Sequence, residues 1–498
     1  MAVTPLVFGR SHADVKLDPA MANRHGLITG STGTGKTVTL RVLVELFSSI
    51  GVPVFLPDIK GDLSGLTRPG GDSTKVIERI QKMNLGQFPF EGYPAVFWDI
   101  FGISGHPVRT TISDMGPLLL SRILGLNDTQ SGVLTMIFKY ADEKGLLLLD
   151  LKDLRAILAY SSEHADEFKA AYGNITPATT GAIQRGLLTL EEQGADRFFG
   201  EPALDVAEIR KVRDGKGIIN LLAADRLFQS PTLYSTFLLW LLSEIYEGLP
   251  ESGDLEKPKL VFFFDEAHLL FKDAPKPLED KIVQIVRLIR SKGVGVFFIT
   301  QSPSDLPDEV LGQLGNKIEH ALRATTPKEM KAVRTVALSL RPNPEFNTEK
   351  IITELAIGEA LVSLLDSEGI PTIVERTVIY PPHSRLLPLS PDERAEEMKK
   401  SELSGKYNTT IDRESAYERL SARAAAENPV KEPEKTKPTK KTAPQSTGTT
   451  THTKKSQASS SGEEIISVIA KTAASPIGRQ IGKEIMRGVL GSLTKGMK

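Results

Sequence analysis

The chain has 498 residues, of which 40% are hydrophobic and 25% charged, as in an ordinary globular protein with a sizeable core. It contains no cysteine, which excludes disulfide scaffolds, thiolate metal sites, iron–sulfur clusters and thiol nucleophiles. The length alone suggests about three domains. The sequence shows no signal peptide and no apolar run of membrane-spanning length, so we expect a cytoplasmic protein without an integral membrane segment.

The net charge of -1 hides an asymmetry along the chain. Residues 429–498 contain 13 Lys or Arg and 5 Asp or Glu, so the remaining residues carry a net charge of -9. An acidic body with a basic tail differs in its partners from an evenly neutral protein. The acidic body argues against extensive phosphate contacts, although a few Lys or Arg in a channel still allow DNA to bind.

Short apolar segments alternate with segments of helical periodicity in much of the chain up to residue 390. This alternation is typical of βαβ units and predicts an α/β fold with a mostly parallel central sheet. The predicted strands span residues 26–29, 52–56, 95–100, 217–222, 260–264, 294–300, 360–365 and 372–379. The predicted helices between them span residues 38–50, 233–246, 278–291 and 327–338.

Residues 112–212 differ from this pattern because apolar residues recur there mainly at helical spacing. They predict a helical insertion, so we expect one interrupted α/β domain over residues 1–390 rather than three separate domains. The predicted helices of the insertion span residues 118–126, 130–140, 151–160 and 178–191.

Three further regions follow this domain. Residues 391–428 are rich in Glu, Lys, Arg and Ala and predict a charged helical extension. Residues 429–461 are mostly Lys, Thr, Ser and Pro and predict a disordered linker. Residues 463–498 regain apolar periodicity with basic neighbours and predict an amphipathic helical tail. Such a tail can dock on its own body, a neighbouring subunit or another protein, or bind nucleic acid or a membrane surface.

Residues 30–37 read GSTGTGKT and match the phosphate-loop pattern G-x-x-x-x-G-K-[ST], between a predicted strand and an amphipathic helix. Backbone N–H groups of such a loop bind phosphates, Lys36 reaches the β- and γ-phosphates, and the Thr37 hydroxyl binds Mg²⁺. The alternative is a glycine-rich loop that binds nothing. The sequence predicts an ATP site formed by Gly30, Ser31, Thr32, Gly33, Thr34, Gly35, Lys36, Thr37 and Val38.

An acidic pair, Asp265 and Glu266, follows the very apolar strand predicted at residues 260–264. A P-loop enzyme needs a strand-end carboxylate for Mg²⁺, and Asp265 fits that role. Glu266 lies one position further and can accept a proton from the attacking water. Asp58, at another strand end, is a weaker competitor for Mg²⁺. The alternative is an acidic pair that only caps the next helix.

A polar residue, Gln301, follows the strand predicted at residues 294–300. An amide at this position can hold the attacking water and sense the γ-phosphate, and the alternative is a solvated turn residue before Pro303. In P-loop ATPases with an additional strand, we expect this strand and the acidic strand to flank the strand of the phosphate loop.

With these motifs the sequence resembles the HerA/FtsK group of P-loop motor ATPases, and within it the bacterial HerA-like proteins of the DUF853 family. The resemblance covers roughly residues 5–385. The phosphate loop and acidic strand end occur in many ATPases, whereas residues 97–130 and 311–324 are more distinctive. The resembling stretches are GSTGTGKT (30–37), VFLPDIKGDLSGL (54–66), FWDIFGISGHPVRTTISDMGPLLLSRILGLNDTQ (97–130), VFFFDEAHLLF (261–271), VGVFFITQSPSDLP (294–307) and LGQLGNKIEHALRA (311–324).

The resemblance implies a RecA-like fold, ATP hydrolysis with Mg²⁺, and a homo-oligomeric ring, commonly a hexamer, that could pump DNA. Rings of this kind place an arginine of one subunit against the γ-phosphate of its neighbour. The candidates are Arg109, Arg287, Arg290 and Arg323, and the distinctive stretches favour Arg109 and Arg323. HerA-type motors usually carry an N-terminal barrel, which we do not expect here because only about 25 residues precede the first predicted strand.

Two functions stay open at this point. The first is an ATP-driven DNA translocase or helicase-like motor, and the second is an ATP-dependent assembly or remodelling protein that acts on a protein partner without DNA. Residues 265–268 also spell the DEAH box of another helicase superfamily, whose members usually have two RecA-like domains. Only one such domain is evident in the sequence, and we expect His268 to be a first-turn helix residue.

Overall fold

Twelve strands form one sheet within the described part of the chain, which is residues 4–253, 255–271, 276–324 and 326–427 of this computed structural model. Their order is β2-β1-β14-β13-β12-β3-β11-β10-β4-β9-β5-β6. The neighbours from β12 to β6 pair in parallel, and those from β2 to β12 pair antiparallel. The strands are β1 (Leu6–Arg10), β2 (Asp14–Leu17), β3 (Gly26–Thr29), β4 (Val54–Asp58), β5 (Ala95–Asp99), β6 (His106–Pro107), β9 (Ile219–Ala223), β10 (Leu260–Phe264), β11 (Val294–Ile299), β12 (Asn316–His320), β13 (Glu359–Ser363) and β14 (Glu375–Ile379).

The α/β fold with a mostly parallel sheet confirms the expected fold class. A separate two-stranded sheet consists of β7 (Val212–Arg213) and β8 (Lys216–Gly217). The predicted linker (429–461) and basic tail (463–498) lie outside the described residues. Among the helices of the described ranges, none combines the length and the apolar character needed to cross a membrane.

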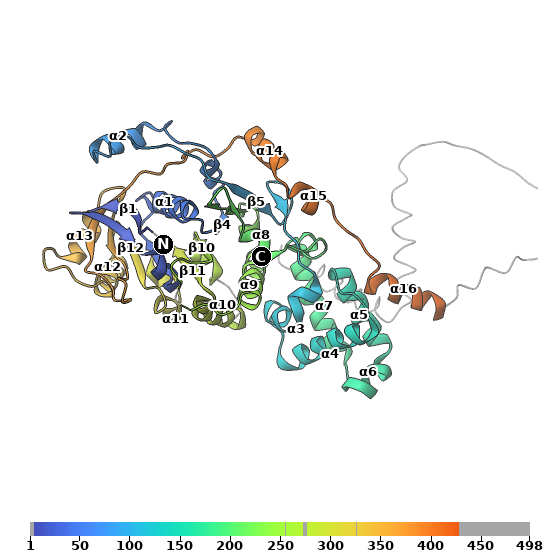
Figure 1. Cartoon of the computed structure of the whole chain (residues 1–498). Helices are drawn as coiled ribbons and strands as arrows, with labels where there is room; N and C mark the ends of the chain where they lie inside the picture. Colours follow the sequence, from blue (N-terminus) through green and yellow to red (C-terminus); the bar gives the residue numbers. More distant parts are fainter. Residues whose placement is uncertain (1–3, 254, 272–275, 325, 428–498) are drawn as a thin grey trace, which may run out of the picture. The chain divides into compact units, whose positions relative to one another are not determined.

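Helices cover both faces of the parallel part of the sheet, which explains why every residue of β10 is buried. Val261 and Phe263 pack into the core beneath α1 (Lys36–Ser49), while Phe262 and Phe264 pack into the core with α9 (Pro231–Gly248) and α10 (Lys276–Ile289). Figure 1 shows α1 and the α9–α10 pair on opposite sides of these strands. The sheet is therefore the middle layer of a three-layer arrangement.

The predicted helical insertion is confirmed and lies beside the sheet (Figure 1). Its second helix shows why the elements begin and end where they do: Asn127 and Gln130 form a capping box, and Gly145 ends the helix in a left-handed conformation. The first helix contains a non-helical break at Gly116, just before Pro117. The helices are α3 (Ile112–Ile123), α4 (Asp128–Lys144), α5 (Leu151–Glu163), α6 (Ala165–Tyr172), α7 (Pro177–Glu192) and α8 (Val206–Ile209).

The remaining helices pack in several places, and the last of them packs against the helical insertion. A third, smaller core lies between β13 and two helices, α12 (Pro327–Ser339) and α13 (Thr348–Glu354). Three helices follow the last strand in the region predicted to be helical and charged. The helices not yet given are α2 (Thr74–Lys82), α11 (Asp308–Leu311), α14 (Pro391–Lys400), α15 (Ser404–Tyr407) and α16 (Ala416–Glu427).

Residues 381–427, here called the strap, run from the sheet to the helical insertion (Figure 1). Near its start, the buried Glu45 of α1 accepts N–H groups of His383 and Ser384 at 2.8 and 3.1 Å. The buried Arg41, one turn earlier in α1, donates to the carbonyls of Arg385 and Leu386. The strap thus holds the charged face of α1 through its backbone.

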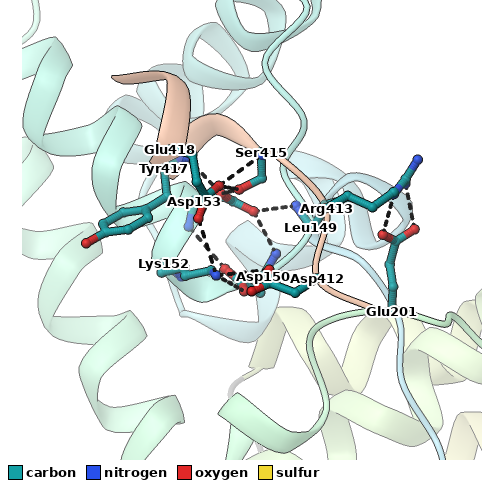
Figure 2. A network of polar contacts seen from close by, with 10 residues as sticks. All are labelled: Leu149, Asp150, Lys152, Asp153, Glu201, Asp412, Arg413, Ser415, Tyr417 and Glu418. Atoms are coloured by element: carbon teal, nitrogen blue, oxygen red, sulfur yellow. Dashed lines mark hydrogen bonds and ion pairs between the residues drawn. The ribbon is translucent and has the colours of Figure 1, made fainter. Parts of the chain in front are cut away.

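The far end of the strap is held by the insertion (Figure 2). Asp153 of α5 is fully buried and accepts hydrogen bonds from the Ser415 hydroxyl and the Tyr417 N–H at 2.5 and 2.9 Å. Arg413 forms a bidentate ion pair with Glu201, with nitrogen–oxygen distances of 2.6 and 2.7 Å. One segment therefore connects the helix of the phosphate loop to the helical insertion.

The order of the strands corrects one expectation. The strand of the phosphate loop, β3, lies between β11 and β12, and the acidic strand β10 lies one position further, beyond β11. The two strands predicted to flank β3 therefore lie on the same side of it. Four strands of this sheet had no prediction. The strand β6 has only two residues, and β1, β2 and β12 are short and mix apolar with charged residues.

Candidate functional site

The phosphate loop connects the end of β3 to the start of α1, and its backbone requires glycine at two points. Gly30 has a φ of 141°, and a Cβ atom there would lie 2.5 Å from the Cβ of His320. Gly35 has a φ of 119°, and a Cβ atom there would lie 3.1 Å from the backbone of Gly358. Neighbouring parts of the chain therefore lie directly against the loop. A larger residue in place of either glycine would push the loop away from them.

Hydrogen bonds from the β12 and β13 side fix the loop further. The Ser31 N–H donates to the Ala321 carbonyl at 2.9 Å, and its hydroxyl accepts the Arg323 N–H at 2.9 Å. Thr34 donates its hydroxyl to the Ser31 carbonyl at 2.7 Å, and its own carbonyl accepts the Gly358 N–H at 2.9 Å. These hydrogen bonds hold the loop in shape.

Lys36 lies folded over this loop. Its Nζ donates to the carbonyls of Gly30 and Ser31 at 2.5 and 3.1 Å. Burial lowers the pKa of Lys36, and the carboxylates of Glu266 and Asp265 act in the opposite direction. Thr32 is exposed at the tip of the loop, whereas Thr37 and Val38 are half-buried in the first turn of α1.

Two residues of β12 that were not predicted individually lie against the loop. The buried His320 bonds Thr39 of α1 through Nε2 at 2.8 Å and the Glu359 carbonyl through Nδ1 at 2.9 Å. Because a carbonyl can only accept, Nδ1 carries the proton and Nε2 accepts from the Thr39 hydroxyl. Burial lowers the pKa of His320 to about 4, so the ring is neutral.

The neighbouring Glu319 is also buried, in register with Thr29 at the end of β3. The Thr29 hydroxyl donates to Glu319 Oε2, while Oε1 has no hydrogen-bond partner among the described residues. Burial raises the pKa of Glu319 to about 8. The only available sequence signal was indirect, since both residues lie within the distinctive stretch 311–324.

Asp265 and Glu266 follow β10 directly, at the same edge of the sheet as the phosphate loop. Asp265 is 8% exposed, and burial raises its pKa. Its Oδ1 accepts the Glu266 N–H at 3.0 Å. Glu266 adopts a left-handed conformation, with φ 49° and ψ 47°, at the start of a short 3-10 helix that contains His268. The backbone therefore turns sharply between the two carboxylates.

A lysine that the sequence did not single out contacts both carboxylates. Lys60 Nζ lies 2.8 Å from Glu266 Oε1 and 3.8 Å from Asp265 Oδ2. Burial raises the pKa of Glu266, but the hydrogen bond and charge of Lys60 more than offset this, so the pKa lies below its usual value. No sequence motif marked Lys60, although it lies within the resembling stretch 54–66.

Asp58, the weaker candidate for Mg²⁺, uses both of its carboxylate oxygens within its own loop. Oδ1 accepts the Asp62 N–H and Oδ2 accepts the Leu63 N–H, both at 3.1 Å. Burial raises the pKa of Asp58 to about 6. These bonds give Asp58 a role in shaping the loop after β4.

Gln301 is exposed just after β11, between the strand ends that carry the phosphate loop and the acidic pair. The turn that follows is built by Asp305, whose Oδ2 accepts the Thr300 hydroxyl at 2.6 Å and the Ser302 N–H at 3.0 Å. The strand order thus places Gln301 beside the loop and the acidic pair, and its role stays a prediction.

The candidate arginines lie in different parts of the chain. Arg323 contacts the phosphate loop through its N–H, and its guanidinium donates to the carbonyls of Thr353 and Leu355 at 2.7 and 3.1 Å. Arg109 is half-buried and donates to the Tyr407 carbonyl of the strap at 2.9 Å. Arg287 and Arg290 are exposed on the α10 side.

A glycine-rich loop between a central parallel strand and a helix, with an acidic pair two strands away, defines a P-loop NTPase of the RecA-like class. The family model described as "Helicase HerA-like C-terminal" matches residues 6–498. The chain belongs to this HerA-like family, which confirms the resemblance noted in the sequence.

Curated relatives agree with this assignment. The chain is 21% identical over 387 residues to the DNA double-strand break repair helicase HerA of Sulfolobus acidocaldarius, covering 73% of this chain and 67% of the relative. It is 22% identical over 360 residues to the protein of the same name from Sulfurisphaera tokodaii, covering 71% and 64%. The chain therefore spans about two thirds of the length of these relatives.

Solved structures share the fold. The plasmid coupling protein TrwB, in complex with a non-hydrolysable GTP analogue, is similar with a TM-score of 0.50 and 14% identity. The match covers 78% of this chain and 93% of that chain. At this level of identity the likeness shows the fold alone.

Proposed function

We propose that this protein is an ATP-hydrolysing motor that uses Mg²⁺. The observation that carries the proposal is the arrangement at one sheet edge: the phosphate loop after β3, Gln301 after β11, and the acidic pair after β10. Parallel strands present their carboxyl ends together, so the three features meet where a bound nucleotide would present its phosphates.

The phosphate loop supplies the binding energy for ATP in this proposal. Backbone N–H groups at the start of α1 face the phosphates, and Lys36 exchanges the carbonyls of Gly30 and Ser31 for phosphate oxygens. A charged phosphate oxygen accepts a stronger hydrogen bond from an ammonium group than a neutral carbonyl does. The preformed loop means that little conformational entropy is lost on binding.

The Mg²⁺ would be held by the Thr37 hydroxyl and the Asp265 carboxylate. Oxygen donors of this kind fit Mg²⁺, which keeps several waters and uses only one or two protein ligands beside substrate phosphates. The described residues contain no group of three or more His, Asp or Glu that could form an all-protein metal cage. When bound, Mg²⁺ neutralises phosphate charge.

Hydrolysis needs a base, a group that orients the water, and a positive charge opposite the γ-phosphate. Glu266 accepts the proton of the attacking water, and Gln301 orients that water. The positive charge comes from Arg109 or Arg323 of a neighbouring subunit in a ring, of which a hexamer is the expected form.

Two substitutions test the ATPase proposal. Lys36→Ala should abolish nucleotide turnover, because the loop loses its only side-chain cation. Glu266→Gln should bind ATP with wild-type affinity and hydrolyse it at least about 100-fold more slowly. Steady-state turnover and binding of a fluorescent ATP analogue measure both effects. Normal turnover in either variant would contradict the assignment.

The further step, from ATPase to DNA motor, is supported by the names of the curated relatives, which are DNA double-strand break repair helicases. The test is turnover with and without single- or double-stranded DNA at two salt concentrations. Stimulation that weakens with salt is the expected result. Absence of stimulation and of salt-dependent binding would instead favour the alternative, remodelling of a protein partner.

A further inference from the structure

Lys60 contacts both carboxylates of the acidic pair, although no sequence motif marks it. Its ammonium lies between the two carboxylates after β10, at 2.8 Å from Glu266 Oε1 and 3.8 Å from Asp265 Oδ2. The same side chain is half exposed, so it reaches the carboxylates from the open side of the site. A charge-assisted hydrogen bond of this length fixes the orientation of the carboxylate that accepts it.

The loop that carries Lys60 is built to hold it there. Asp58 bonds two backbone N–H groups of the loop, from Asp62 and Leu63. Arg41 of α1 donates to the Asp62 carbonyl, which ties the loop to the helix of the phosphate loop. Lys60 therefore projects from a segment anchored at both ends, and its position follows that of α1.

Glu266 is a residue that needs such support. Its left-handed backbone, with φ 49°, is an unfavourable conformation for a residue other than glycine. Its second oxygen faces His268 Nδ1 only at 3.6 Å. The hydrogen bond from Lys60 is thus much shorter than the contact with His268.

We propose that Lys60 is a positioning residue that holds the Glu266 carboxylate in the orientation from which it accepts the proton of the attacking water. The proposal rests on the proposed role of Glu266 in ATP hydrolysis. Lys60 itself stays an ammonium throughout and transfers no proton. Its effect is on the rate of the chemical step, because a base held in one rotamer reacts more often than one that samples several.

The experiment compares Lys60→Ala, Lys60→Gln and Lys60→Arg with the wild-type chain. We expect Lys60→Ala and Lys60→Gln to lower kcat by about 10- to 100-fold, the usual cost of removing a group that orients an active-site residue. KM for ATP should change less than about 3-fold, and Lys60→Arg should recover much of kcat. Lys16→Ala, an exposed lysine on β2, is the matched control and should behave as wild type.

A double variant separates this inference from the proposed function. If Lys60 acts through Glu266, then Lys60→Ala should have almost no further effect in the Glu266→Gln background. An equal loss in both backgrounds, or a kcat that is unchanged or raised in Lys60→Ala, overturns the role of Lys60 while leaving Glu266 as the base. Normal turnover of Glu266→Gln alone overturns both. Thermal unfolding and ATP-analogue binding show that each variant is folded.

Discussion

Thr39 of α1 and His320 of β12 are joined by a hydrogen bond of 2.8 Å, and the same imidazole holds the Glu359 carbonyl at 2.9 Å. The helix that begins at the phosphate loop is thereby tied to the strand on one side of β3 and to β13 beyond it. Because the Cβ and backbone of His320 also lie against Gly30, this one buried residue contacts both ends of the loop.

The neutral state of His320 predicts a pH dependence of stability. Its pKa falls from 6.5 to about 4 on folding, so between these values the unfolded chain binds a proton that the folded chain does not. The contribution is complete above pH 6.5 and is lost as pH falls toward 4, by about 3 kcal/mol in total. Denaturant unfolding at pH 7 and pH 5 should show a smaller pH effect in His320→Gln than in the wild type.

The matched control for this measurement is His12→Gln, since His12 is 92% exposed. Its unfolding should keep the wild-type pH effect. Part of that effect should persist in His320→Gln as well, because burial also lowers the pKa of His25 to about 4. Identical pH dependence in wild type and His320→Gln would show that His320 takes up protons equally in the folded and unfolded chain.

Glu319 predicts the opposite sign. Burial raises its pKa from 4.5 to about 8, so the folded chain holds a proton that the unfolded chain releases. The stability that this carboxyl contributes is complete below pH 4.5 and is lost as pH rises toward 8. Glu319→Gln should therefore gain stability over the wild type between pH 6 and pH 9, measured by thermal unfolding. Glu309→Gln, an exposed control on α11, should follow the wild type.

The fit of the phosphate loop predicts different effects for two glycines. Gly30→Ala places a methyl group 2.5 Å from His320 Cβ, so we expect loss of ATP binding and lower stability. Gly33→Ala has open space around the new methyl group and pays only for its positive φ of 77°, on the order of 1 kcal/mol. Isothermal titration with an ATP analogue and thermal unfolding measure both. Equal effects would mean that the contact with His320 adds nothing.

The contacts between Glu45 and the strap predict that removing this side chain strongly destabilises the folded chain. Glu45→Ala leaves the buried Ser384 N–H, the partly buried His383 N–H and the Ser384 hydroxyl without their acceptor, which should lower the free energy of unfolding by roughly 3 kcal/mol. Glu78→Ala, at an exposed position of α2, should change it by less than about 0.5 kcal/mol. Urea unfolding gives both values, and similar stabilities of the two variants would rule out a structural role for this contact.

Much of the fold could be predicted because the buried strands are runs of apolar residues and the helices have apolar residues at helical spacing. Phe262 and Phe264 mark β10 without ambiguity, and the insertion carries capping residues such as Asn127. The residues of β12 mix charged and apolar types, so no pattern marks it as a strand. Its burial follows from a position beside β3, which only the assembled sheet defines.

The candidate site divides in the same way. Lys36, Thr37 and Asp265 lie in short motifs, so a short stretch of sequence is enough to propose them as ligands of phosphate and Mg²⁺. Lys60, Glu319 and His320 come from loops and strands distant in sequence, and their contacts depend on strand order. The order itself was predicted wrongly for β10, because motifs along a chain do not specify which strands become neighbours.

The strap has a consequence for how the chain is made. Arg41 and its partner Arg385 are 344 residues apart, and Glu45 and Ser384 are 339 apart. At ribosomal rates of about 5–20 residues per second, the helix of the phosphate loop waits on the order of tens of seconds for the segment that hydrogen-bonds its buried Arg41 and Glu45. During synthesis, the phosphate loop is therefore complete before the helix that follows it has made its contacts with the strap.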